Sequence, residues 1–299
     1  PAKLADLESF EIQKEIGTDT STLVVLLTGI LRHEAGDYHT ALERFESILH
    51  EDDVSTFIDP STLYFYIGCS HGHLDEFELA IANYDKAVEL NPSNAIVYNN
   101  RGIAYKNLGQ YDKAFEDYGK SIALDPKYPL PYYNRGNLYD DLNEYTRAIQ
   151  DFNAAIELDP NYTKAYYNRG NTYRHLKQYE RAIQDYDMAI ELDPDYSIAY
   201  RNRGLAYSDL EKYERAIQDY SKAIELDPEY TLAYNSRGNA YRNLGQYERA
   251  IQDYDKAIEL DPDYSTAYKN RGYAYQALGK LAEAEADFRK YEELTGKKP

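Results

Sequence analysis

The side chains best suited to bind a metal stand close together near residue 70. Cys69 and His73 are four residues apart, which on a helix places a thiolate and an imidazole on one face, where they can share a metal ion. His71 lies between them, at a position where later parts of the chain carry tyrosine, and no fourth ligand is evident. Packing within a diverged helix is the preferred interpretation, so no metal or other cofactor is predicted.

Catalytic motifs are missing from the sequence. It contains no glycine-rich phosphate loop, no nucleophile elbow and no HExxH motif. The carboxylates of the recurring DPDY, DPEY and DPNY segments indicate helix ends rather than a calcium loop, because no aspartate-rich loop of about twelve residues surrounds them. We therefore predict that the protein is not an enzyme.

Asparagines recur at an interval of 34 residues, with Ser236 in the one gap. Each carboxamide has one acceptor and two donors, so a row of them can hold the N–H and C=O groups of an extended peptide. The same residues could instead order helix ends, and the sequence leaves both interpretations open. The row consists of Asn100, Asn134, Asn168, Asn202 and Asn270.

Arginine and aspartate recur at the same interval, and the two residue types are present or absent together. The six arginines are Arg101, Arg135, Arg169, Arg203, Arg237 and Arg271, and the six aspartates are Asp117, Asp151, Asp185, Asp219, Asp253 and Asp287. This joint occurrence predicts ion pairs, either between two helices of one repeat or between neighbouring repeats. An unpaired buried charge costs several kcal/mol, so a structural role is favoured over ligand binding.

All of these side chains occupy fixed positions in a repeat of 34 residues. Glycines at 68, 102, 136, 170, 204, 238 and 272 define position 8 of each repeat. Apolar residues follow at spacings of three, four and seven, with a break near position 15, which is typical of two antiparallel helices. Tyrosine at position 4 is predicted to lie in the core, the glycine marks a close approach of two helices, and proline at position 32 ends the second helix.

This pattern resembles the tetratricopeptide repeat (TPR). Seven units of 34 residues cover 61–298, namely 61–94, 95–128, 129–162, 163–196, 197–230, 231–264 and 265–298. Residues 22–60 form a degenerate repeat, 22–55, followed by the insertion 56–60, and 1–21 are expected to hold a capping helix or partial repeat. The resemblance implies an all-α, right-handed superhelical solenoid whose first helices line a concave groove. Stacking is needed because one helix pair cannot bury its apolar face alone.

Positions 2, 5, 6, 9, 12 and 13 share one face of the first helix, which this fold directs into the groove. Besides the asparagine row, the predicted peptide-binding residues are Tyr133, Tyr167, Asn137, Asn171, Asn239, Lys164, Arg174, Arg201, Arg242 and Lys269. Aromatic and amide side chains suit a peptide, and cations outnumber carboxylates on this face. No three successive repeats supply the residues of a chaperone-tail clamp, so a receptor of that type is not expected.

Charge, hydropathy and cysteine content indicate which partners and which compartment to expect. The formal net charge of −19 is concentrated before residue 95, which disfavours nucleic acid and anionic lipid. The apolar run from Leu23 to Leu31 is too short to span a bilayer, so membrane insertion is not expected. A single cysteine fits a reducing compartment and favours the cytoplasm. The chain starts at Pro1, so we expect a fragment or a processed form.

These observations predict a non-catalytic scaffold that binds an extended peptide segment of a partner protein in its concave groove. Two alternatives remain open. The repeats could form a structural module that self-associates through the C-terminal repeat, where a tyrosine replaces the usual alanine at position 27 and position 32 lacks proline. The chain could also be an accessory domain of a larger enzyme or chaperone adaptor.

Overall fold

The computed structural model describes residues 21–51 and 54–299, and within these ranges the secondary structure is helical with no strand. The all-α class is thereby confirmed. The chain divides into two compact units, Pro1–Asn143 and Glu144–Pro299, and each is described by itself. The predicted capping helix in 1–21 lies almost wholly outside the described residues, since α3 begins at Ser21.

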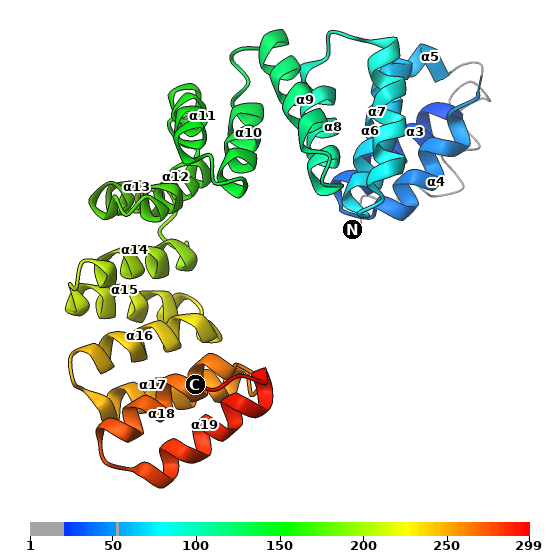
Figure 1. Ribbon diagram of the computed structural model, residues 1–299. Helices are drawn as coiled ribbons and strands as arrows, with labels where there is room; N and C mark the ends of the chain where they lie inside the picture. The colour runs from blue at the N-terminus through cyan, green and yellow to red at the C-terminus, as the bar shows by residue number, and fades with distance from the viewer. Residues whose placement is uncertain (1–20, 52–53) are drawn as a thin grey trace. The chain divides into compact units, whose positions relative to one another are not determined.

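The N-terminal unit contains helices α3 to α10 (Figure 1). Their bounds are α3 Ser21–Glu34, α4 Tyr38–Ile48, α5 Val54–Phe57, α6 Pro60–His73, α7 Phe77–Leu90, α8 Ala95–Asn107, α9 Tyr111–Leu124 and α10 Pro129–Asp141. The expected insertion 56–60 is partly helical: it overlaps the short α5, and Pro60 opens α6, where the carboxylate of Asp59 caps the helix by accepting from the Thr62 N–H.

The C-terminal unit contains α11 to α19, and from α12 onward they stack in chain order (Figure 1). The bounds are α11 Tyr145–Leu158, α12 Thr163–His175, α13 Tyr179–Leu192, α14 Ser197–Asp209, α15 Tyr213–Leu226, α16 Thr231–Asn243, α17 Tyr247–Leu260, α18 Ser265–Ala277 and α19 Leu281–Thr295. Consecutive helices pack on one another, and the first helices of neighbouring repeats also touch, α12 with α14, α14 with α16, and α16 with α18. This direct contact joins the first helices into one surface.

Glycine at position 8 allows the two helices of a repeat to approach closely. A Cβ added to Gly204 would lie 2.6 Å from the Tyr220 ring, and one added to Gly170 would lie 2.8 Å from the Tyr186 ring. The ring at position 24 is in turn fully buried in most repeats. In the C-terminal unit it packs on alanine at position 20 and on the residue at position 10 of the next repeat, as in the cluster of Ala182, Tyr186 and Ala206. The core is therefore continuous from one repeat to the next.

The tyrosines at position 4 were predicted to be core residues, and this prediction is wrong for most of them. Tyr98 is buried, whereas Tyr166, Tyr200, Tyr234 and Tyr268 are only half-buried. The helical spacing was read correctly, but the arginine three residues later covers the ring, so tyrosine forms the margin of the core rather than its centre.

The turn between the two helices of a repeat requires a left-handed residue at position 15. Glycine supplies it in the degenerate repeat 22–55 and in three of the seven regular repeats, but Lys177 and Glu211 adopt the same conformation, each with φ 58°. Replacing either residue by glycine should raise the free energy of unfolding by about 1 kcal/mol, because a side chain disfavours this region. Urea denaturation measures the effect. The control Gln184→Gly, on the exposed face of α13, should lower stability by a similar amount.

Candidate peptide-binding face

Arginine at position 7 pairs with aspartate at position 23 of the same repeat. In the repeat 163–196, Nε and a terminal nitrogen of Arg169 donate to the two carboxylate oxygens of Asp185 at 2.8 and 2.6 Å. The same two-pronged pair joins Arg101 to Asp117, Arg203 to Asp219, Arg237 to Asp253 and Arg271 to Asp287. Arg135 and Asp151 belong to different units, where Arg135 is half-buried and Asp151 buried.

The other terminal nitrogen of these guanidinium groups reaches the preceding repeat. In Arg169 it donates to Oδ1 of Asn153 on α11 at 2.6 Å. The acceptor at this place, position 25, is Asp85 for Arg101, Asp187 for Arg203, Ser221 for Arg237 and Asp255 for Arg271. The sequence did not predict the contact with position 25, because the residue type there changes from repeat to repeat. Every one of these side chains nevertheless accepts a hydrogen bond. Each arginine therefore ties three helices together.

Burial and ion pairing have opposite effects on the pKa of the arginine and on that of the aspartate. Burial alone would lower the pKa of Arg169, but the hydrogen bonds and charge of Asp185 raise it above the ordinary value. Burial raises the pKa of Asp185, and Arg169 opposes that rise. The guanidinium also lies 5.5 Å from the centre of the Tyr166 ring, a favourable cation–π distance. All of these contacts lie within the chain.

The asparagines at position 6 donate hydrogen bonds to the preceding repeat. Nδ2 of Asn134 donates to Oδ1 of Asn99 at 2.9 Å, and Nδ2 of Asn270 donates to Oδ1 of Asn235 at 2.9 Å. Nδ2 of Asn202 reaches both the Tyr167 hydroxyl and Oδ1 of Asn171. These bonds cross between first helices, and they fix the plane of each carboxamide.

The same row contains two further members. Asn100 donates from Nδ2 to Sγ of Cys69 at 3.4 Å, and Asn168 is half-buried on α12. Asn202 is the most enclosed of the row, with 9% of its surface exposed. The row thus links repeats, a function that sequence spacing alone did not reveal.

Position 9 supplies an acceptor to the buried tyrosine at position 24. Oδ1 of Asn171 accepts from the Tyr186 hydroxyl at 2.7 Å, and Oδ1 of Asn239 accepts from the Tyr254 hydroxyl at 2.8 Å. Asn137, the third asparagine predicted at this position, is half-buried on α10. These amides are therefore partly structural as well.

Tyr118 is buried like Tyr186, but position 9 of its repeat is Ile103, and its hydroxyl has no hydrogen-bond partner in the structure. Tyr118→Phe should therefore leave stability unchanged or raise it by up to about 1 kcal/mol, whereas Tyr186→Phe should lower it by about 1 kcal/mol, since it removes a buried hydrogen bond to Asn171. Thermal and urea unfolding of the two variants gives the comparison. Equal losses would contradict the assignment.

The cations at the predicted groove positions of the first helices differ in whether a carboxylate pairs with them. Nζ of Lys106 lies 2.7 Å from a carboxylate oxygen of Asp141, and Nε of Arg174 lies 3.0 Å from one of Asp209. In both pairs a cation at position 12 meets an acid at position 13 of the next repeat. Arg242 also occupies position 12, but Ala277 occupies that next position 13.

The other predicted groove residues lie at the surface or against aromatic rings. Lys164 is exposed on α12, and the Lys269 ammonium lies 5.2 Å from the centre of the Tyr291 ring. Tyr133 is half-buried, while the Tyr167 ring lies 5.1 Å from that of Tyr196. Tyr196 occupies position 34, the last residue of a DPDY segment.

Cys69 lies beside a cavity of about 340 Å³ in the N-terminal unit, which Phe77 also lines. Its Sγ accepts from the Tyr84 hydroxyl at 3.5 Å, and burial raises the pKa of the thiol. The His73 ring stacks on Tyr38 at 4.3 Å between centroids. Across residues 21–51 and 54–299, no group of three or more His, Cys, Asp or Glu side chains could hold a metal ion.

Comparison with known proteins identifies the class to which this architecture belongs. Models described as "Tetratricopeptide repeat" match 95–128, 129–162, 163–196, 197–230, 220–252 and 265–297, and a model described as "TPR repeat" matches 74–109 and 238–279. The chain belongs to the tetratricopeptide-repeat family, which serves in general as a scaffold for protein interactions and not as a catalyst. A search of curated proteins returned no match.

Solved structures agree with this assignment. MamA from Desulfovibrio magneticus RS-1 is 26% identical, with 57% of this chain and 97% of that chain covered and a TM-score of 0.54. YrrB, described as a TPR protein with an unusual peptide-binding site, is 26% identical, with 60% and 92% covered and a TM-score of 0.50. A tetratricopeptide repeat protein from Parabacteroides merdae is 23% identical, with 79% and 93% covered and a TM-score of 0.62, and shares the fold.

Membrane-spanning segments were sought over the part of the chain that the structure describes. None of its helices combines the length and the apolar composition that crossing a bilayer requires.

Proposed function

We propose that the chain is an interaction scaffold that holds an extended peptide segment of a partner protein along its first helices. The observation that carries this proposal is the fixed row of carboxamides at position 6. Asn134 and Asn270 each use one N–H toward the preceding repeat, so the second N–H and the carbonyl oxygen, which accepts no hydrogen bond within the described residues, remain for a ligand. A carboxamide fixed before binding loses little entropy when it binds.

The side chains around the row suit the same ligand. Ile198 and Leu232, at position 2, are 42% and 41% exposed, which gives the face apolar points for peptide side chains. Tyr167 and Tyr133 add half-buried rings. The likeness to YrrB, described as having a peptide-binding site, supports this use of the fold.

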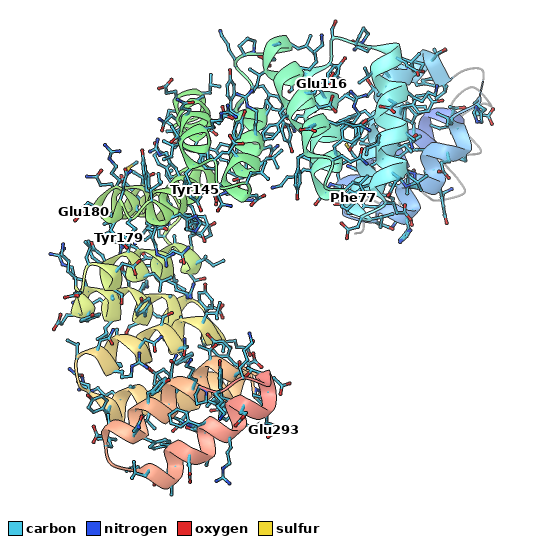
Figure 2. All side chains as sticks on the ribbon, in the orientation of Figure 1. Phe77, Glu116, Tyr145, Tyr179, Glu180 and Glu293 are labelled. Carbon is cyan, nitrogen blue, oxygen red and sulfur yellow. The ribbon has the colours of Figure 1, made fainter. Side chains whose placement is uncertain are left out.

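Changing Asn134 and Asn270 together to alanine tests the proposal. A peptide selected from a display library on the unmodified protein should lose at least about tenfold in affinity, measured by fluorescence anisotropy, because hydrogen bonds to its backbone disappear. The control Glu116→Ala/Glu180→Ala changes two exposed residues on second helices (Figure 2) and should leave affinity unchanged. Circular dichroism verifies folding. Unaltered affinity in the double asparagine variant would remove the carboxamides from the mechanism.

Self-association through the last repeat is a second candidate. Leu281, the first residue of α19, is 66% exposed, which is the largest exposure among the large hydrophobic residues of the described chain. Sedimentation velocity over a wide concentration range tests it, and a mass that stays at that of the monomer would exclude it.

A further inference from the structure

The face formed by α12, α14, α16 and α18 carries a charge opposite to that of the whole chain. Its groove positions hold five cations, Lys164, Arg174, Arg201, Arg242 and Lys269, and one carboxylate, Asp209, in a protein of net charge −19. Arg174 is already paired with Asp209 at 3.0 Å. The excess positive charge therefore belongs to the remaining four cations.

Arg201 is poorly satisfied in the unbound protein. Its Nε is buried with no hydrogen-bond partner among the described residues, and its NH1 donates to Oδ1 of Asn202 at 3.4 Å, the long limit of a hydrogen bond. The guanidinium also interacts with the neutral Tyr230 hydroxyl, which does not balance its charge. The guanidinium lies 5.9 Å from the centre of the Tyr230 ring, and no carboxylate pairs with it among the described residues. This contrasts with neighbouring Arg203, whose guanidinium holds two carboxylates.

Arg242 lacks the partner that its position has elsewhere. Lys106 and Arg174, also at position 12, each bind an aspartate at position 13 of the next repeat, whereas Arg242 is followed there by Ala277. No salt bridge of Arg242 occurs within 21–51 and 54–299, and its side chain is partly exposed. Arg242 is therefore a position 12 cation without the aspartate that Lys106 and Arg174 meet in the next repeat.

We propose that Arg201 and Arg242 bind two carboxylate side chains of an acidic peptide segment, which deepens and rests on the peptide-binding function proposed above. The two residues lie on adjacent first helices, α14 and α16. Helices pack about 8–10 Å apart, and seven positions along a helix add about 10 Å, so the two Cα atoms are on the order of 14 Å apart. An extended peptide covers that length in about four residues. The expected ligand therefore has two acidic residues about four apart.

The probe is a fluorescein-labelled peptide with two glutamates four residues apart, leucine and alanine between them, and both termini blocked. Its anisotropy should show saturable binding that weakens with added NaCl, and replacing both glutamates by glutamine should weaken binding at least about tenfold. Blocked termini exclude recognition of a C-terminal carboxylate. A single-stranded RNA oligonucleotide serves as the competing anion.

Two variants test whether binding needs the unpaired charge of Arg242. Arg242→Gln removes the charge, and Ala277→Asp leaves Arg242 in place but supplies the acid found at position 13 elsewhere; Ala277 is exposed, so the fold tolerates it. Each should weaken binding of the glutamate peptide by about fivefold to tenfold, as should Arg201→Gln. The control Arg181→Gln removes a cation from the exposed face of the second helix α13 and should change affinity less than about twofold.

Equal affinity for the glutamate and glutamine peptides, no effect of Ala277→Asp, or binding of RNA alone would overturn the assignment. The outcome is distinct from failure of the proposed function. If a display-selected peptide still binds the first helices but acidic peptides do not, only the acidic specificity is wrong.

Discussion

Arg169→Ala should lower the free energy of unfolding by about 3–5 kcal/mol, the usual loss when one partner of a buried ion pair is removed. Asp185 is 4% exposed and accepts two hydrogen bonds from Arg169, so it would remain as an unpaired buried carboxylate. The substitution also removes the contact with Asn153, which joins the repeat to the one before it. Urea denaturation gives the total effect, and hydrogen exchange should show the loss concentrated in α12 and α13.

A matched control uses the same residue type in a different environment. Arg181 is exposed on α13 and contacts only Gln178 and the Tyr173 ring. Arg181→Ala should therefore cost less than about 0.5 kcal/mol. The double variant Arg169→Met/Asp185→Leu should be more stable than Arg169→Ala, since no charge stays buried. If Arg169→Ala and Arg181→Ala cost the same, the ion pair is not what stabilises the repeat.

Gly204→Ala should destabilise the protein by about 1–3 kcal/mol, although alanine favours helices. The new methyl group would lie 2.6 Å from Cε1 of Tyr220, and this ring is 1% exposed and cannot move away without disturbing the core. The same change at Gly119, in α9, meets nothing within 4 Å. There, alanine should stabilise the protein by about 0.5–1 kcal/mol through helix propensity alone. Thermal unfolding of the two variants therefore should shift in opposite directions, and shifts of the same sign would contradict the close approach.

Sequence spacing was sufficient for the fold and for the ion pairs. Glycines 34 residues apart and helical apolar spacing predicted the repeat, and the chain is indeed an all-α array of TPR helices. The joint occurrence of arginine and aspartate indicated partners such as Arg169 and Asp185, because a buried charge needs a counterpart, but it left open whether the pair lies within one repeat or between neighbours. Strict recurrence alone did not give the depth of burial, because the position 4 tyrosines recur in every regular repeat and most of them lie only at the margin of the core.

Features that vary between repeats were not predicted. The third partner of each position 7 arginine is Asp, Asn or Ser, so no single residue type marks it. The hydrogen bonds of Asn134 and Asn270 cross between repeats, and sequence spacing does not show which neighbour an amide meets. Within the part of the chain that the structure describes, Arg242 lacks a carboxylate partner because an alanine occupies position 13 of the following repeat. That alanine can be recognised as a missing partner only once the structure shows Arg174 paired with Asp209.

Hydrogen–deuterium exchange in the presence of a display-selected peptide tests the central claim most directly. If the peptide lies along the first helices, protection from exchange should increase in α12, α14, α16 and α18 and stay unchanged on the exposed faces of α13, α15 and α17. Protection confined to the second helices, or to α19 alone, would contradict binding on this face and favour assembly through the outer surface or the last repeat.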